Sequence, residues 1–145
     1  MSSISEIQSA VVAKVLANRC QGKATLAINL GGATTVKTTS AITYTVNGVA
    51  LTKTALAAQS MVPTHDAYGD LVATGILAYV QPANTTVYYV ISLNAAGGVA
   101  VSQGSYAGQT QVYPTNLSKT AIGNGVVPVE PLGYTGVGIV KVTTA

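Results

Sequence analysis

The sequence predicts a mainly β protein: a single antiparallel β-sandwich or barrel-like domain at residues 23–145, preceded by an N-terminal helical arm at residues 1–22. Frequent Thr, Val and Tyr, together with 15 Gly, favour strands and tight turns over long helices. Apolar and polar residues alternate along several segments after residue 22, as in a half-buried strand. Asn47-Gly48 separates two such segments and indicates a hairpin, because both residues accept positive φ. Alternation does not reveal strand order, so sandwich and barrel both stay open.

The first expected element is the helix of the arm. Ser3 and Glu6 have the spacing of a capping box, in which each side chain bonds the other's backbone N–H. Apolar residues then recur at helical spacing, at Ile4, Ile7, Val11, Val15 and Leu16. Residues 18–22 supply the stop signal. The apolar face either covers the β domain or docks onto a neighbouring subunit, and the sequence favours neither.

Strands are expected along the rest of the chain. In the first half they fall at residues 26–30, 34–39, 42–46 and 49–53, of which 34–39 is polar and placed at a sheet edge. The segment 54–70 is less regular. In the second half the strands are 71–80 with a bend, 87–93, 99–103 and 139–142. Residues 87–93 are apolar on both faces, which is typical of a central strand. Residues 104–125 read as a long surface loop, and loops of that length usually serve function or bind a partner.

Charge is scarce in this chain. Charged residues make up 8% of it, against roughly 25% in an ordinary soluble domain, while hydrophobic residues make up 48%. With no Trp and no Phe, aliphatic residues and eight Tyr must build the core. A surface of Thr, Ser, Asn, Gln, Gly and Ala is easily buried against other protein, because little charge must be desolvated. The composition therefore predicts a subunit of an assembly.

The few charges are unevenly distributed. Residues 1–53 carry five cations against Glu6 alone, a net charge of +4, and the remainder carries a net charge of −1. The cations of the first part are Lys14, Arg19, Lys23, Lys37 and Lys53. They are dispersed, with no Arg cluster, which disfavours nucleic acid as the partner. An acidic protein surface fits them better.

Chemistry-bearing groups are few, and the chain is expected to be no enzyme and to hold no cofactor or metal. His65, Asp66 and Asp70 form one local cluster in a turn-rich segment, where the Asp side chains are expected to cap the turn. Cys20 is a lone thiol, so it forms no internal disulfide, and nothing in the sequence pairs it with His65 as a nucleophile. No apolar run approaches a membrane span, and no secretory signal pattern is present, so use in a reducing cytoplasm before assembly is expected.

A carbohydrate site is an alternative. It depends on Tyr88, Tyr89, Tyr106, Tyr113 and Tyr134, whose rings could stack on sugars.

The C-terminal half resembles a known class of proteins. The residues that carry the resemblance are the strand 88–93, a Gly turn at 97–98, the strand 99–103, the Pro-rich segment 127–134 and the closing strand 138–142. Over residues 40–145 this pattern is similar to capsid decoration (cement) proteins and related small head proteins of tailed bacteriophages.

The resemblance implies a non-catalytic virion subunit, usually trimeric and sometimes dimeric. Such a subunit clamps neighbouring copies of the major capsid protein. The capsid contacts are expected at Ile4, Ile7, Val11, Lys14, Val15, Arg19, Lys23 and Lys37. The contacts between subunits are expected at Tyr106, Tyr113, Pro128, Pro131 and Tyr134. A tail or head-fibre subunit that binds a receptor or glycan is the alternative function.

Overall fold

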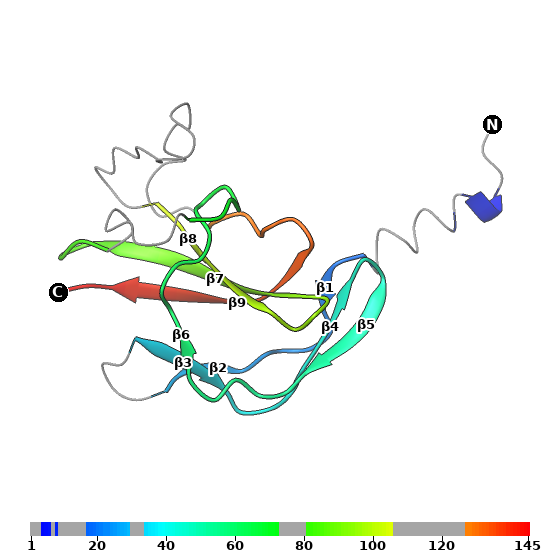
Figure 1. Ribbon diagram of the computed structural model, residues 1–145, viewed down its shortest axis with the longest axis horizontal. Helices are drawn as coiled ribbons and strands as arrows, with labels where there is room; N and C mark the ends of the chain where they lie inside the picture. The colour runs from blue at the N-terminus through cyan, green and yellow to red at the C-terminus, as the bar shows by residue number, and fades with distance from the viewer. Residues whose placement is uncertain (1–3, 7, 9–16, 30–33, 73–80, 106–126) are drawn as a thin grey trace.

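Figure 1 shows a computed structural model of the chain, which describes residues 4–6, 8, 17–29, 34–72, 81–105 and 127–145. The described part is mainly β. Its strands are β1 (Arg19–Cys20), β2 (Leu26–Ile28), β3 (Thr35–Thr38), β4 (Ile42–Val46), β5 (Val49–Lys53), β6 (Gln59–Ser60), β7 (Thr86–Asn94), β8 (Val99–Gln103) and β9 (Tyr134–Thr143).

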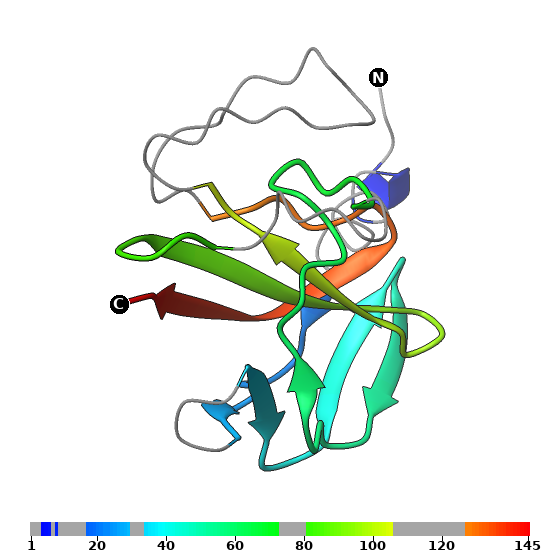
Figure 2. The ribbon, with the colours of Figure 1, turned by 60° about the vertical axis from the view of Figure 1, so that its left-hand side comes forward.

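The strands form three antiparallel sheets of three strands each. Sheet A has the order β1-β4-β5, sheet B the order β2-β3-β6 and sheet C the order β8-β7-β9. Sheet C lies over sheets A and B, so the domain has two layers (Figures 1 and 2). No sheet among the described strands closes on itself. The barrel alternative is therefore wrong, and the antiparallel β class is confirmed.

The β4–β5 hairpin is where it was predicted. Val46 pairs with Val49 across a two-residue turn. In that turn Asn47 has a φ of 50° and Gly48 a φ of 79°, the left-handed values that this tight turn requires. The turn is fastened to the segment before β1, because the Gly48 N–H donates to the Ala17 carbonyl at 2.8 Å.

The main core lies between the layers. It joins buried side chains of sheets A and B to the inner face of sheet C, and its members are Ala24, Val36, Ile42, Tyr44, Val46, Leu56, Ile91, Leu93 and Val137. Tyr44 is the largest fully buried side chain, and its hydroxyl donates to the Asn94 carbonyl at 3.0 Å. Burying such a ring is a large stabilising contribution, and the hydrogen bond satisfies its polar end.

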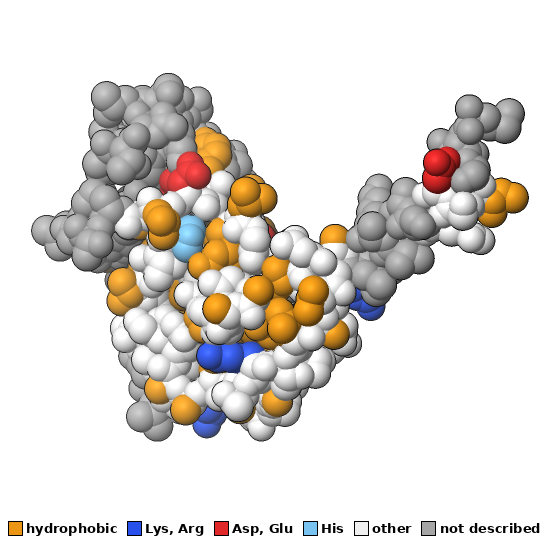
Figure 3. Space-filling model, turned by 45° about the vertical axis from the view of Figure 1, so that its right-hand side comes forward, with side chains coloured by type: hydrophobic (Ala, Val, Ile, Leu, Met, Phe, Trp, Pro, Cys, Tyr) orange, Lys and Arg blue, Asp and Glu red, His pale blue; other side chains and the backbone are white. Residues whose placement is uncertain are grey.

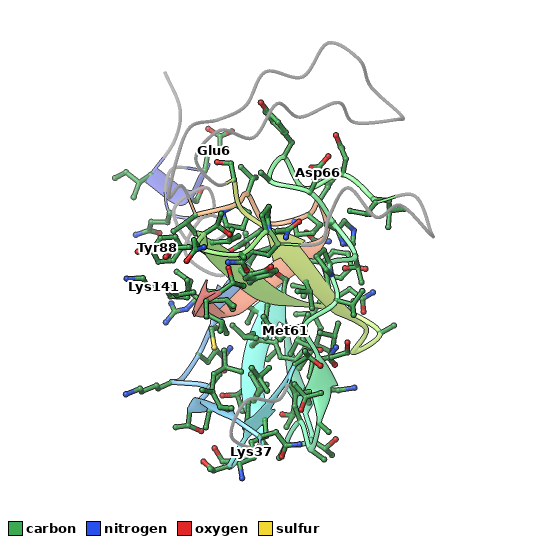
Figure 4. The ribbon with its side chains drawn as sticks, turned by 90° about the vertical axis from the view of Figure 1, so that its left-hand side faces the viewer. Glu6, Lys37, Met61, Asp66, Tyr88 and Lys141 are labelled. Carbon is green, nitrogen blue, oxygen red and sulfur yellow. The ribbon has the colours of Figure 1, made fainter. Side chains whose placement is uncertain are left out.

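A second apolar cluster extends the core along sheet C. It consists of Val87, Tyr89 and Val101, and Met61 packs against it as well as against the main core. Figure 4 places Met61 between the layers. The Tyr89 hydroxyl donates to Gln81 Oε1 at 3.1 Å and accepts from Gln103 Nε2 at 3.0 Å. Burial raises the pKa of this phenol, and the hydrogen bond from Gln103 opposes the rise.

The position of two strands differs from the prediction. Residues 34–39 were expected at a sheet edge, but β3 is the central strand of sheet B, with Val36 and Thr38 buried. The last strand was expected at 139–142, but β9 begins at Tyr134 and includes a bulge opposite Ile91 and Ser92. In both cases a polar or Gly-rich stretch belongs to a strand because another element of the chain packs against it.

Two glycines show why β9 starts early. A Cβ on Gly136 would collide with the Glu130 side chain, and a Cβ on Gly138 would collide with Leu26. Glycine therefore marks the close approach of another element, not a break in the strand.

The remaining predicted elements are either confirmed or fall partly on residues that the structure does not describe. The central β7 and its return strand β8 are confirmed, whereas β6 was not foreseen. Residues 73–80 and 106–126, which hold most of the expected bent strand and long loop, lie outside the described part, although Gly104 and Ser105 are described and buried. Of the expected helix, only residues 4–6 and 8 are described as helical. Strand β1 pairs with β4, so sheet A begins before residue 23.

Candidate functional site

Two surfaces on opposite sides of the domain carry the charged groups. The basic layer comprises the cations of sheets A and B and their connections, which are Arg19, Lys23, Lys37 and Lys53. The loop layer comprises residues 63–72 and 127–133, which hold three of the four carboxylates of the chain, Asp66, Asp70 and Glu130. Figure 4 places Lys37 and Asp66 at opposite ends of the molecule.

The basic layer contains no acidic residue at all, since residues 17–60 include neither Asp nor Glu. Arg19 is exposed on β1, and its backbone is held to β4 by Thr45, whose Oγ1 accepts from the Arg19 N–H at 3.2 Å. Lys37 lies opposite Ala27 on the outward side of β3, because its neighbours Val36 and Thr38 face the core. Arg19, Lys37 and Lys53 therefore stand on strands and Lys23 on the connection between two strands, with no acidic residue in this part of the sequence.

The two ends of this layer also expose apolar side chains. Ile28 is 66% exposed at the end of β2, and Val49 is 60% exposed at the start of β5. Figure 3 shows hydrophobic side chains spread over one face of the domain, with Lys and Arg below them and Asp and Glu above. Apolar contact area between sparse charges is typical of a protein-contact surface.

The loop layer begins as an extension of sheet C. Residue His65 bridges Ser102 of β8 in parallel. The N–H groups of Thr64 and His65 both donate to the Val101 carbonyl, at 2.9 and 3.1 Å, and the Gln103 N–H donates to the His65 carbonyl at 3.1 Å. The loop thus covers the edge that β8 would otherwise expose.

Asp66 then fixes the turn. Its buried carboxylate accepts from the N–H of Tyr68 at 2.8 Å and from the N–H of Asp70 at 3.1 Å, through the same oxygen Oδ1. The Asp66 N–H donates in turn to the Asp70 carbonyl at 2.8 Å. The prediction that an Asp side chain caps this turn is confirmed. Among the described residues, no three His, Cys, Asp or Glu side chains are grouped so that they could hold a metal ion.

His65 is buried beside this turn. Its Nδ1 lies 2.8 Å from Thr64 Oγ1, and its ring meets the Tyr134 ring edge-on with centroids 5.6 Å apart. Burial lowers the pKa of His65 below 6.5, although the carboxylates of Asp66 and Asp70 oppose the shift. The imidazole is therefore a packed, neutral part of the loop layer near pH 7.

This environment predicts a pH dependence of stability. The unfolded chain protonates His65 near pH 6.5, whereas the folded chain resists protonation to a lower pH. The stabilising contribution is present above pH 6.5 and is lost as the pH falls from there toward the lowered pKa. We expect the free energy of unfolding in urea to decline between pH 7.5 and pH 5, a range above the ordinary carboxylate titrations. His65→Gln should flatten this decline, and equal slopes for both proteins would contradict the assignment.

Three of the predicted subunit-contact residues lie in the loop layer or next to it: Pro128 and Pro131 belong to it, and Tyr134 begins β9. Pro128 and Pro131 are buried against the chain itself, and Tyr134 is half-buried against His65. The Tyr134 hydroxyl also accepts from Asn94 Nδ2 at 3.3 Å. These residues hold the segment 127–133 against the segment 63–72. The Val129 N–H does the same, because it donates to the Ala67 carbonyl at 3.0 Å.

The predicted capsid-contact residues are only partly placed. Ile4 is exposed in the helical turn 4–6. Arg19 and Lys23 are exposed and Lys37 is half-exposed, all in the basic layer. Four other predicted capsid contacts lie outside the described part, namely Ile7, Val11, Lys14 and Val15. The same holds for two predicted subunit contacts, Tyr106 and Tyr113. Cys20 lies in β1, where its thiol donates to the Gly22 carbonyl at 2.8 Å and packs against the main core.

One polar feature was not foreseen from the sequence. Ser92 on β7 and Ser102 on β8 are fully buried, and neither hydroxyl has a hydrogen-bond partner in the described structure. Register places both on the face of sheet C that bears Val90, because Val90 pairs with Ser102. No local pattern in the sequence indicates their burial.

Comparison with known proteins finds no match among protein-family models, curated proteins or solved structures. Within the described residues, no helix has both the length and the apolar character needed to span a membrane.

Proposed function

We propose that this chain is a virion structural protein that decorates a bacteriophage capsid and stabilises it by bridging major capsid subunits, without catalysis. The observation that carries the proposal is the basic layer: four cations on the strands of sheets A and B and their connections, no acidic residue from 17 to 60, and exposed apolar side chains beside them. The resemblance to decoration proteins supplies the partner, and the low overall charge suits extensive burial against protein.

The proposal includes the architecture of the subunit. It is a two-layer β-sandwich whose N-terminal helical arm docks on a neighbour in the particle, and it works as a homo-oligomer. The basic layer faces the capsid, because the acidic loop layer lies on the far side and would meet an acidic capsid surface unfavourably. Its location is the virion, after assembly in the host cytoplasm.

The glycan-binding alternative has weaker support. Of the five tyrosines on which it depends, Tyr89 is buried between hydrogen-bond partners, and Tyr134 packs edge-on against His65. Tyr88 lies beside Lys141 on sheet C (Figure 4), paired with it in register. Stacking on a sugar needs an exposed ring face, which the buried Tyr89 does not offer.

A charge-reversal experiment tests the proposal. Heads of the virus that encodes the chain, assembled without it, are mixed with the purified protein at low and moderate salt, and binding is measured by co-sedimentation. We expect Arg19→Glu with Lys37→Glu to weaken binding by about tenfold or more, with a smaller difference at higher salt, because the contacts are partly electrostatic. Bound wild-type protein should also raise the temperature at which the heads lose their DNA.

Leu132→Glu provides the control, because Leu132 is fully exposed in the loop layer, on the side opposite the basic layer, and the substitution adds negative charge there. If this substitution weakens binding as strongly as the pair does, the basic layer is not the contact. If the wild-type protein does not bind heads at all, the capsid role is wrong.

A further inference from the structure

The outer edge of β9 presents unpaired backbone groups. In an antiparallel sheet the N–H and C=O of one residue point to the same side, and successive residues alternate. The Tyr88 carbonyl accepts from Gly104, and the Asn94 N–H donates to Gly98, so even-numbered residues of β7 face the β8 side. Odd-numbered residues of β7 therefore face β9.

Register then decides which groups of β9 point away. Tyr89 pairs with Val140, so the backbone of Val140 faces β7 and the backbones of Ile139 and Lys141 face outward. The Thr144 N–H, which donates to the Thr85 carbonyl, confirms this alternation. Sheet C ends at β9, and no strand within the described residues pairs with its outer side. Figure 2 shows β9 with β7 on one side only.

This edge has little of the usual protection, namely one Lys and one bulge. Edge strands in soluble proteins are typically short, covered, or interrupted by Pro, charge or a bulge. The opposite edge of sheet C is covered by Thr64 and His65, the edge strands β1, β2 and β6 have at most three residues, and the edge strand β5 has five. In contrast, β9 has ten residues and no Pro, and Lys141 is its one charge. Ile139, in the C-terminal half of β9, has a side chain that is 58% exposed.

We propose that β9 pairs with β9 of a second copy of this chain, antiparallel about a two-fold axis at Val140. This register places Ile139 opposite Lys141 of the other copy, and each such pair exchanges both of its outward N–H···O bonds. It also places Val140 of one copy opposite Val140 of the other copy, on the face of sheet C that points to the core. The apolar stem of Lys141 covers the exposed Ile139, and the two ammonium groups lie on a diagonal, not directly opposite each other.

The self-complementary edge is what favours a second copy. A register centred on Lys141 would oppose two like charges, whereas the register centred on Val140 satisfies the outward groups without doing so. A two-fold contact uses the edge of both partners and closes at two subunits. The solution state is then a dimer, not the trimer that the resemblance implies. This inference concerns contacts between copies and stands or falls independently of the capsid proposal.

The test is Lys141→Pro, with Lys141→Thr as the matched control. Proline removes the outward N–H of residue 141, which has no bond within the subunit, and proline is tolerated at outward-facing edge positions. In sedimentation equilibrium we expect the wild-type protein and Lys141→Thr to be dimers. Lys141→Pro should dissociate about tenfold or more readily, because the substitution removes a hydrogen bond at two symmetric places. An unchanged urea midpoint for a diluted, monomeric sample shows that the variant is folded.

Amide hydrogen exchange of the wild-type protein is the second measurement, which does not depend on the variant folding. The amides of Ile139 and Lys141 should be protected at high protein concentration and exposed after dilution, while the amide of Val140 is protected at both. A monomer at every concentration, a trimer, or a dimer in which the amides of Ile139 and Lys141 stay exposed would each overturn the proposal.

Discussion

Replacing Tyr44 with alanine is expected to lower the free energy of unfolding by about 3–5 kcal/mol, the range for truncating a large aromatic side chain in a core. The side chain is 1% exposed and belongs to the cluster that joins sheets A and B to sheet C. Since a domain of this size is stable by only about 5–15 kcal/mol, the variant should unfold at a far lower urea concentration than the wild-type protein.

Tyr44→Phe separates packing from hydrogen bonding. It keeps the ring and removes only the hydroxyl that donates to the Asn94 carbonyl. That carbonyl keeps a second partner, the Gly97 N–H at 3.0 Å, so the loss should be near the lower end of the usual range, about 0.5 kcal/mol. If Tyr44→Ala and Tyr44→Phe were destabilised equally, the ring would contribute little and the two-layer core would be assigned wrongly.

Replacing Asp66 with alanine is expected to have the second largest effect. The N–H groups of Tyr68 and Asp70 would lose their shared acceptor in a partly buried turn, and a hydrogen bond to a charged group contributes about 1.5–3 kcal/mol. Because this turn covers the outer face of sheet C, limited proteolysis should cut the chain near residues 66–70 faster in the variant, in addition to a reduced urea midpoint.

Asp66→Asn is the matched control, since its Oδ1 can still accept from both N–H groups. We expect it to keep most of the wild-type resistance to proteolysis. Equal cleavage of Asp66→Ala and the wild-type protein would show that the carboxylate does not hold the turn.

The sequence predicts this fold best where the signal is local. The β4–β5 hairpin depends on two residues that accept positive φ, and β7 depends on a run that is apolar on both faces. The start of β9 could not be predicted in this way, because Gly136 and Gly138 lie where the side chains of Glu130 and Leu26 approach the strand, and neither residue belongs to β9. The central place of β3 likewise depends on β6, a two-residue strand with no pattern of its own.

For the candidate surfaces too, the local features could be predicted from the sequence and the features that depend on packing could not. The basic residues could be named from the sequence, since their number and the lack of acidic residues around them are properties of composition. Their gathering on the side opposite Asp66 and Glu130 could not, because it results from the stacking of sheet C on sheets A and B. The burial of the two serines and of His65 could not be predicted either, since polar residues give no local sign of burial.

The distance in sequence between β7 and β9 also bears on synthesis in the cell. Central strand β7 gains its second neighbour only from residues 134–143, so sheet C is incomplete until the ribosome has translated that segment. The β4–β5 hairpin needs only adjacent residues and can form much earlier, because local contacts close faster than distant ones. Until β9 is made, the edge of β7 that pairs with β9 stays open. A ribosome that stops short of residue 134 therefore releases a chain with the aggregation hazard of an unfinished sheet.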